Sequence, residues 1–272
     1  MNLHKLILTN NDCYKAGKTI TPKGIMVHST GANNPNLKRY VGPDDGLLGV
    51  NQYGNHWNTA TPGGRQVCVH AFIGKLKDGS IATYQTLPWN MRGWHGGGSS
   101  NNTHIGFEIC EDGLSDPAYF SAVYKEAVEL CVYLCKLYGL TEKNIICHCE
   151  GYKLGIASNH GDVMHWWPKH GKSMDSFRAE VKAALSSGTV QSPTPAAEPD
   201  TFSPYRVRVS IANLNIRKGP GTNFNTVGRY TGKGVFTIVE EANGAGASKW
   251  GLLKSYAKSR TGWISLDYAT KL

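Results

Sequence analysis

The chain lacks any long apolar run. Charged or amide side chains interrupt every hydrophobic stretch before it reaches the ~18–20 consecutive apolar residues that a membrane-spanning helix needs. The stretch from Met1 to Gly17 mixes Lys, His, Asn and Asp with apolar residues, unlike the hydrophobic segment of a secretory signal. We therefore expect no membrane insertion and no signal peptide. With 40% hydrophobic and 18% charged residues among 272, the composition excludes fibrous and wholly disordered classes.

Histidine and cysteine are both absent after His170. All ten His lie between His4 and His170, and all seven Cys lie between Cys13 and Cys149. An odd number of cysteines in a chain of this length argues against a disulfide framework and favours reduced thiols, as in a cytoplasm. The uneven distribution predicts two modules with different chemistry.

Composition also predicts where the modules separate. Residues 187–204 are small, polar and Pro-rich, which is typical of a linker, and they divide a first domain at 1–186 from a second at 205–272. The first domain holds 18 Lys+Arg against 15 Asp+Glu, whereas the second holds 11 against 3. This basic excess favours an anionic partner for the second domain, although it is also compatible with a role in solubility alone.

The first domain alternates strand-like and helix-like stretches, which predicts an α/β fold. The clearest helix follows Asp116 and Pro117, which suit an N-cap and a first turn, and runs from Tyr119 to Tyr138 before Gly139. Another is expected at Asp175–Leu185. Strands are expected at Ile25–His28, Val67–Ile73, Ile81–Tyr84, Ile105–Cys110 and Ile145–His148.

The second domain is rich in Gly and in short β-type runs, which predicts a small all-β barrel. Its expected strands are Tyr205–Val209, Leu214–Arg217, Val235–Glu240, Trp250–Leu253 and Gly262–Ile264.

Two histidines stand at the ends of predicted strands, where side chains leave a sheet toward a cleft. They are His28 and His148, and the loop 157–165 adds three candidate ligands: His160, Asp162 and His165. Two His and a third donor leave one position open on tetrahedral zinc, as in catalytic sites. Alternation along a strand should point Cys147 and Cys149 away from His148. The competing interpretation is that each His is an ordinary core or surface residue.

Glu108 lies inside an apolar run, Ile105–Cys110, where burying a carboxylate is costly unless the group is paired or used. A desolvated Glu beside a metal site is a candidate general base. The alternative is a strand-end acid that reaches solvent beside Glu111 and Asp112.

Six separated segments occur in the order seen in type-2 N-acetylmuramoyl-L-alanine amidases, relatives of the peptidoglycan recognition proteins that are common among phage endolysins. The resemblance spans about residues 24 to 180, and the C-terminal stretch resembles a bacterial SH3 domain. The amidase-like segments are Ile25–Thr30, Val69–Phe72 with Lys77–Gly79, Gly93–Gly97, Asn102–Glu108, His148 and Asn159–Asp162. The SH3-like segments are Ala212–Gly221, Val227–Gly228, Gly234–Val235, Lys249–Leu253 and Gly262–Ile264.

The resemblance implies a mixed central sheet with flanking helices, followed by an SH3-like barrel. It implies Zn²⁺-dependent hydrolysis of the amide bond between N-acetylmuramic acid and L-alanine, which would lyse the host cell wall. His28 and His148 match the family's zinc histidines, and Asp162 matches the third ligand best, with His160 and His165 as alternatives.

The resemblance also implies catalytic roles. Glu108 matches the acid that activates water in members without a catalytic Tyr, a position that Val69 occupies here. His160 stands where many relatives have an oxyanion-stabilising Lys, and His95 is a candidate for lining the substrate groove.

The implied partners are peptidoglycan and, through the SH3-like domain, an anionic wall polymer, with no nucleic acid. The residues that contact the wall are unknown. An endolysin would stay in the host cytoplasm until a holin opens the membrane, and then act on the cell wall. The alternative function is a non-catalytic peptidoglycan-binding protein.

Overall fold

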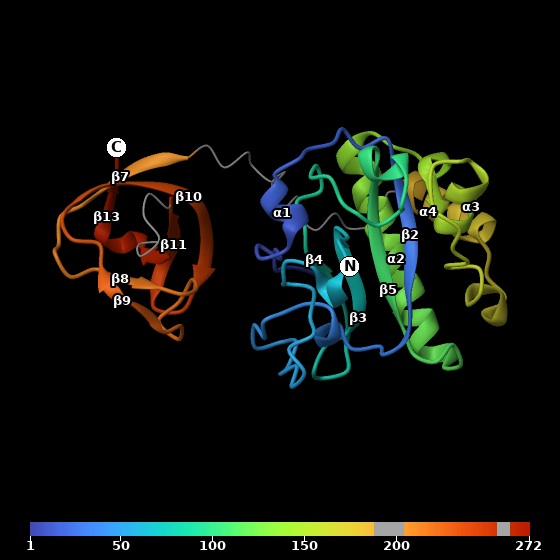
Figure 1. The fold of residues 1–272 in the computed structure, drawn as a ribbon, viewed down its shortest axis with the longest axis horizontal. Coiled ribbons are helices and arrows are strands. Elements are labelled where there is room, and N and C mark those ends of the chain that lie inside the picture. Colours follow the sequence, from blue (N-terminus) through green and yellow to red (C-terminus); the bar gives the residue numbers. More distant parts are fainter. Residues whose placement is uncertain (188–203, 255–261) are drawn as a thin grey trace. The chain divides into compact units, whose positions relative to one another are not determined.

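The computed structural model describes residues 1–187, 204–254 and 262–272, and it divides into two compact units, Met1–Pro195 and Ala196–Leu272 (Figure 1). The predicted linker 187–204 lies almost wholly outside the described residues. Helix α4 (Met174–Ser187) ends before it, and strand β7 (Tyr205–Val209) begins after it. The domain boundaries at 1–186, 187–204 and 205–272 stay predictions.

A six-stranded mixed sheet forms the centre of the first unit, in the order β1-β4-β3-β5-β2-β6. β3 and β4 pair antiparallel, and every other neighbouring pair is parallel. This confirms the predicted mixed α/β fold. The strands are β1 (Leu3–Lys5), β2 (Gly24–Asn33), β3 (Ala71–Lys75), β4 (Ile81–Gln85), β5 (His104–Glu111) and β6 (Ile145–Cys147).

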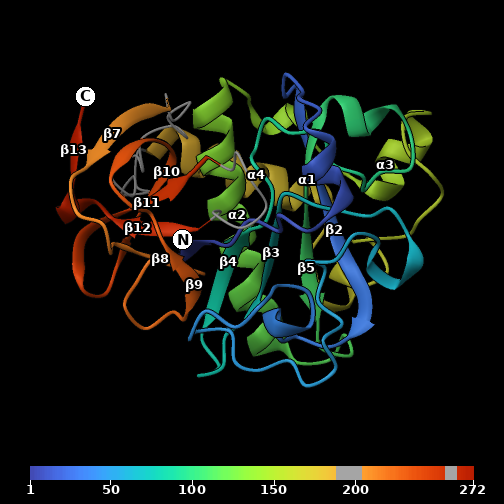
Figure 2. The same cartoon turned by 60° about the vertical axis from the view of Figure 1, so that its left-hand side comes forward.

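Helix α2 (Pro117–Tyr138) lies with α4 against one face of this sheet (Figures 1 and 2). Asp116 caps α2 by accepting hydrogen bonds from the backbone N–H groups of Ala118 and Tyr119, and Gly139 ends it in the left-handed conformation. These ends confirm the predicted helix. The shorter helices are α1 (Asp12–Ala16) and α3 (His148–Lys153), with 3₁₀ turns at Leu37–Arg39, Pro62–Gly64, Ser99–Asn102, Glu142–Asn144 and Trp167–His170.

The alternation of side chains along β2 and β5 places two candidate site residues on the same face. Val27 of β2 and Phe107 of β5 belong to the core under α2, so their neighbours point to the opposite face. Those neighbours are His28 and Glu108, whose Cα atoms are partners in the parallel β2–β5 pair. The register of one strand pair therefore sets the two side chains next to each other.

Two expectations about local structure need correction. β3 begins at Ala71 rather than at Val67, and Cys68 instead forms an isolated bridge with Trp94. His148 is not a strand residue but the first residue of α3.

The prediction that Cys147 and Cys149 point away from His148 nevertheless holds. Both side chains pack toward the core under α2, with their Sγ atoms 3.2 Å apart. The reason is the start of a helix rather than strand alternation.

The second unit is an antiparallel all-β sheet in the order β13-β7-β10-β11-β12-β8-β9, consistent with an SH3-like fold. Its buried residues include Val207, Ile216, Ile238 and Ile264. β9 and β13 were not predicted. The remaining strands are β8 (Asn215–Arg217), β9 (Thr226–Tyr230), β10 (Gly234–Gly244), β11 (Ala247–Leu253), β12 (Trp263–Ser265) and β13 (Ala269–Lys271), and a 3₁₀ turn covers Leu266–Tyr268.

Across the described parts of the chain, no helix is both long and apolar enough to span a membrane.

Replacing Leu130 tests the core between α2 and the sheet. This side chain is fully buried, so Leu130→Ala should lower the stability of the first unit by about 2–5 kcal/mol through lost burial and the cavity left behind. Calorimetry of the full chain would measure the shift. Lys125→Ala, at an exposed position of the same helix, should stay within about 0.5 kcal/mol of the parent. Equal unfolding temperatures for the two variants would contradict the assignment of Leu130 to this core.

Candidate metal centre and active site

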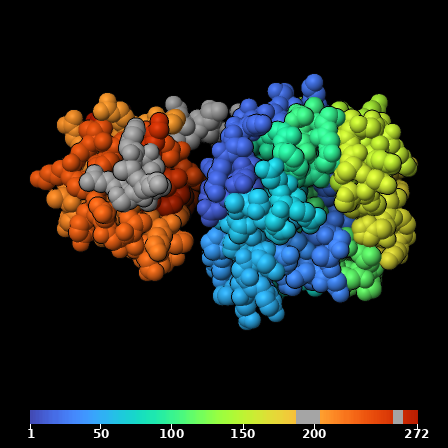
Figure 3. Space-filling view, in the orientation of Figure 1, coloured from blue at the N-terminus to red at the C-terminus, as the bar shows by residue number. Residues whose placement is uncertain are grey.

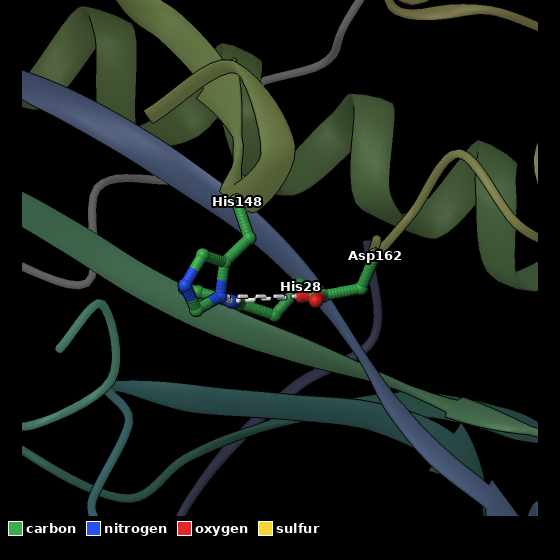
Figure 4. A group of neighbouring side chains, drawn as sticks. All are labelled: His28, His148 and Asp162. Carbon is green, nitrogen blue, oxygen red and sulfur yellow. Dashed lines mark hydrogen bonds and ion pairs between the residues drawn. The ribbon is translucent and has the colours of Figure 1, made fainter. Parts of the chain in front are cut away.

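Three side chains of the first unit direct ligand-type atoms at one point (Figure 4). The Nδ1 atoms of His28 and His148 are 3.1 Å apart, and Asp162 Oδ2 lies 3.0 Å from the first and 3.6 Å from the second. All three residues are buried. They come from β2, from the first residue of α3 and from the loop after α3, so separate parts of the chain build the cluster.

The geometry of this cluster fits a tetrahedral metal ion. An ion bonded to two imidazole nitrogens and a carboxylate oxygen at about 2.0–2.1 Å would hold them about 3.3 Å apart, close to the spacing observed. Imidazole and carboxylate donors suit zinc and related ions. Three ligand atoms this close together in a buried place form a site that a cation can occupy. His28, His148 and Asp162 are therefore able to hold a metal.

The protonation tendencies of the cluster agree with metal binding. Burial lowers the pKa of His28, which favours its neutral, ligand-competent form. Burial alone would raise the pKa of Asp162, but its close contacts with His148 and His28 outweigh burial and hold that pKa well below the usual range. The aspartate is thus an anion wherever the protein is folded near neutral pH.

The loop 157–165 offers three donors, and the structure brings only Asp162 into the cluster. The ring of His160 is exposed and stacks on that of His148, with centroids 4.7 Å apart. His165 points elsewhere, because its Nε2 lies 2.9 Å from Glu111 Oε1.

Glu108 lies beside the cluster in an unusual electrostatic state. Its Oε2 atom is buried and has no hydrogen-bond partner among the described residues. Burial, followed by the charges of Asp162 and Glu111, raises the pKa of Glu108 well above its usual value. A carboxyl group in this state holds a proton more tightly than a solvated one and has a free oxygen with which to exchange it.

A cleft of about 790 Å³ opens over these residues, on the face of the sheet opposite α2. His28, Glu108, His148, His160 and Asp162 all line it. Further lining comes from Trp57, Arg65, Gln66, Trp94 and His95. Figure 3 shows the surface of the first unit, where these segments from distant parts of the sequence meet.

His95 lines the cleft but has both ring nitrogens engaged. Its Nδ1 lies 3.0 Å from His28 Nε2, and its Nε2 lies 3.2 Å from the carbonyl oxygen of His104. Burial lowers the pKa of His95 well below its usual value, so the ring is neutral. Contact of His95 with a substrate stays a prediction.

Sequence reasoning missed two polar residues around the cluster. Ser158 Oγ lies 3.1 Å from His148 Nε2, and the buried Asn101 accepts hydrogen bonds from the backbone of the loop that carries His95. Ser158 stands in the same candidate-ligand loop as Asp162, which was its only signal. Asn101 follows a Gly-rich stretch, and no sequence pattern indicated its role.

The solved structures that match this chain include PlyL, with 20% identity over 67% of this chain and 96% of that chain at a TM-score of 0.47. The Staphylococcus aureus hydrolase AmiA in complex with its ligand has 19% identity over 70% and 86%, at 0.49. The catalytic domain of XlyA has 24% identity over 66% and 99%, at 0.45. No curated protein matches the chain.

The family match covers the site and strands β2 to β6. Residues 18–163 match the Amidase_2 family, N-acetylmuramoyl-L-alanine amidase. This span is more than half of the chain, and it includes Glu108 and all three residues of the candidate metal cluster. The chain therefore belongs to the N-acetylmuramoyl-L-alanine amidase family.

Proposed function

We propose that this protein is a zinc-dependent N-acetylmuramoyl-L-alanine amidase of the endolysin type. It hydrolyses the amide bond between N-acetylmuramic acid and L-alanine in bacterial peptidoglycan. The observation that carries the proposal is the convergence of His28, His148 and Asp162 beside a carboxyl group, Glu108, that has a raised pKa and a free oxygen. Family membership supports the reaction class.

The three cluster residues would hold zinc, with one position left for water or substrate. When bound, zinc supplies a Lewis acid that activates water and polarises the amide carbonyl. His28 and His148 contribute ring nitrogens, burial favours the neutral form of His28, and Asp162 contributes a negative charge.

Glu108 acts as the general base and then as the general acid. It accepts a proton from the attacking water and passes it to the nitrogen of the departing L-alanine, which leaves as a neutral amine. Its buried oxygen, which has no hydrogen-bond partner among the described residues, is available to take the proton and then to return it.

His160 lies at the open side of the cleft and donates a hydrogen bond to the oxyanion that develops on the carbonyl. Its exposed ring, stacked on His148, leaves it free to face a substrate in the cleft. The presence of both Asp162 and Glu108 argues against the alternative of a non-catalytic peptidoglycan-binding protein.

The second unit binds an anionic wall polymer. Along β7, Val207 and Val209 are buried while the intervening Arg206 and Arg208 are exposed, so two guanidinium groups project from the same face of one strand. Two exposed positive charges on one face of a strand attract a polymer that carries negative charges. As an endolysin, the protein would stay in the host cytoplasm until holin-mediated release and then act at the cell wall.

The reaction products test the proposed activity. Purified peptidoglycan treated with the protein should gain free L-alanine amino termini but no new reducing sugar ends. Chelation should abolish the gain and zinc should restore it. Glu108→Gln should slow the reaction by roughly 10²–10⁴-fold because the proton acceptor is lost, and Glu142→Gln, away from the cleft, should not. New reducing ends would identify a glycosidase instead, and a wall that is bound but not cleaved would favour the non-catalytic alternative.

The raised pKa of Glu108 predicts a specific pH dependence of stability without metal. Below the unfolded-state pKa, both states carry the proton. As pH rises toward the folded-state pKa, only the unfolded chain ionises, so stability is lost at about 1.4 kcal/mol per unit of pKa shift. Glu108→Gln should therefore gain stability over the parent with rising pH, and the difference should vanish near pH 4. Urea titrations in the presence of chelator would measure it. Parallel curves would mean that the pKa of Glu108 is ordinary.

Salt and substitution test the wall-binding surface. The double variant Arg206→Gln, Arg208→Gln should bind walls more weakly and lose binding less steeply as salt rises, because fewer counterions are displaced. Co-sedimentation of the full chain with walls measures both effects. Lys233→Gln, an exposed charge outside β7, serves as the control. A double variant that matches this control would place the wall contact elsewhere.

A further inference from the structure

Each histidine of the candidate metal cluster has to present an unprotonated nitrogen. A neutral imidazole carries one proton, so its partner on the far nitrogen decides which nitrogen remains free for a metal. In both His28 and His148 the nitrogen that faces the cluster is Nδ1. The groups around Nε2 of each ring therefore determine whether the cluster is ready to bind.

His28, His95 and the carbonyl of His104 form a hydrogen-bond relay in which the proton of each ring has one possible position. A backbone carbonyl accepts and never donates, so the contact between His95 Nε2 and the His104 carbonyl places the His95 proton on Nε2. His95 Nδ1 is then an acceptor, and it takes the Nε2 proton of His28, 3.0 Å away. His28 Nδ1 consequently keeps a free lone pair toward the cluster.

The partners of His148 form a second relay of the same sense. Ser158 Oγ lies 3.3 Å from the Gly96 carbonyl oxygen, to which its hydroxyl donates. Its lone pair then accepts the Nε2 proton of His148 at 3.1 Å. His148 Nδ1 is left free, as in His28.

Both relays depend on one segment, residues 93–101. Asn101 Oδ1 accepts hydrogen bonds from the backbone N–H groups of His95 and Gly96, at 2.9 and 2.8 Å, and so fixes the loop. The Gly96 carbonyl also accepts the N–H of Ser158 at 2.8 Å.

Two glycines leave room for the relay side chains. A Cβ on Gly106 would lie 2.4 Å from His95 Nδ1, and one on Gly97 would lie 2.5 Å from Ser158 Oγ. Gly97 also has a positive φ of 67°, which other residues rarely adopt. Gly97, in the Gly-rich segment after Trp94, and Gly106 of β5 thus leave space for the side chains that contact the metal ligands.

We propose that His95 and Ser158 are positioning residues that set the tautomers of His28 and His148, so that both histidines offer Nδ1 to the metal. The inference rests on the proposed function, since it assumes that zinc is the ion bound. It assigns to the loop 93–101 the role of favouring, in both histidines, the tautomer that metal binding requires.

Zinc affinity of the full-length protein, measured by competition with a chromogenic chelator, tests this directly. Removing an outer hydrogen-bond partner of a metal ligand typically weakens metal binding 10–100-fold. His95→Leu and Ser158→Ala should each show a loss of this size. His95→Asn retains an acceptor near the position of Nδ1 and should recover most of the affinity. Ser121→Ala, an exposed serine on α2, is the matched control and should bind zinc like the parent.

The outcomes distinguish the positioning role of His95 and Ser158 from the proposed amidase function. Wild-type protein that binds zinc tightly while His95→Leu and Ser158→Ala bind it equally well would overturn the positioning role and leave the amidase proposal intact. Failure of His95→Asn to recover affinity beyond that of His95→Leu would also overturn the relay, because the loss would then reflect packing. A wild-type protein that binds no zinc would refute both the relay and the proposed function. Thermal unfolding of each metal-free variant confirms that the unit remains folded.

Discussion

The convergence of two imidazole nitrogens and one carboxylate oxygen in a buried place is the constraint on which the site depends. Such donors repel one another unless a proton or a metal cation lies between them, so the fold must supply enough packing to hold them together. It does so with β2, which carries His28 and lies between β5 and β6, and with α3, which begins at His148. The α2 core on the opposite face supports both elements.

The cleft contains two carboxyl groups whose pKa values shift in opposite directions. Asp162 lies against two histidines and stays ionised, whereas Glu108 has a buried oxygen without a polar partner and retains its proton more tightly. Different environments of this kind give two carboxyl groups different chemical roles. The aspartate is suited to hold a cation permanently, and the glutamate is suited to exchange a proton during each cycle.

The sequence was sufficient for features whose signal is local. Helix α2 has a capping residue, an apolar stripe and a terminating glycine, and Glu108 is conspicuous inside an apolar strand. The choice of Asp162 among three donors of one loop was implied by family resemblance but not by spacing, since loop geometry has no periodicity. Ser158 and the engagement of His95 escaped notice because their partners are backbone carbonyls and side chains far away in the sequence.

X-ray absorption at the zinc edge of the full-length protein tests the central claim most directly, because it reports the atoms bound to the metal. The proposed centre predicts a spectrum with nitrogen and oxygen neighbours at about 2.0–2.1 Å, two of them from imidazole, and no sulfur. Sulfur neighbours at about 2.3 Å would instead place the metal on thiolates such as Cys147 and Cys149, on the other side of His148. Either sulfur ligation or a protein that retains no zinc would contradict a site built from His28, His148 and Asp162.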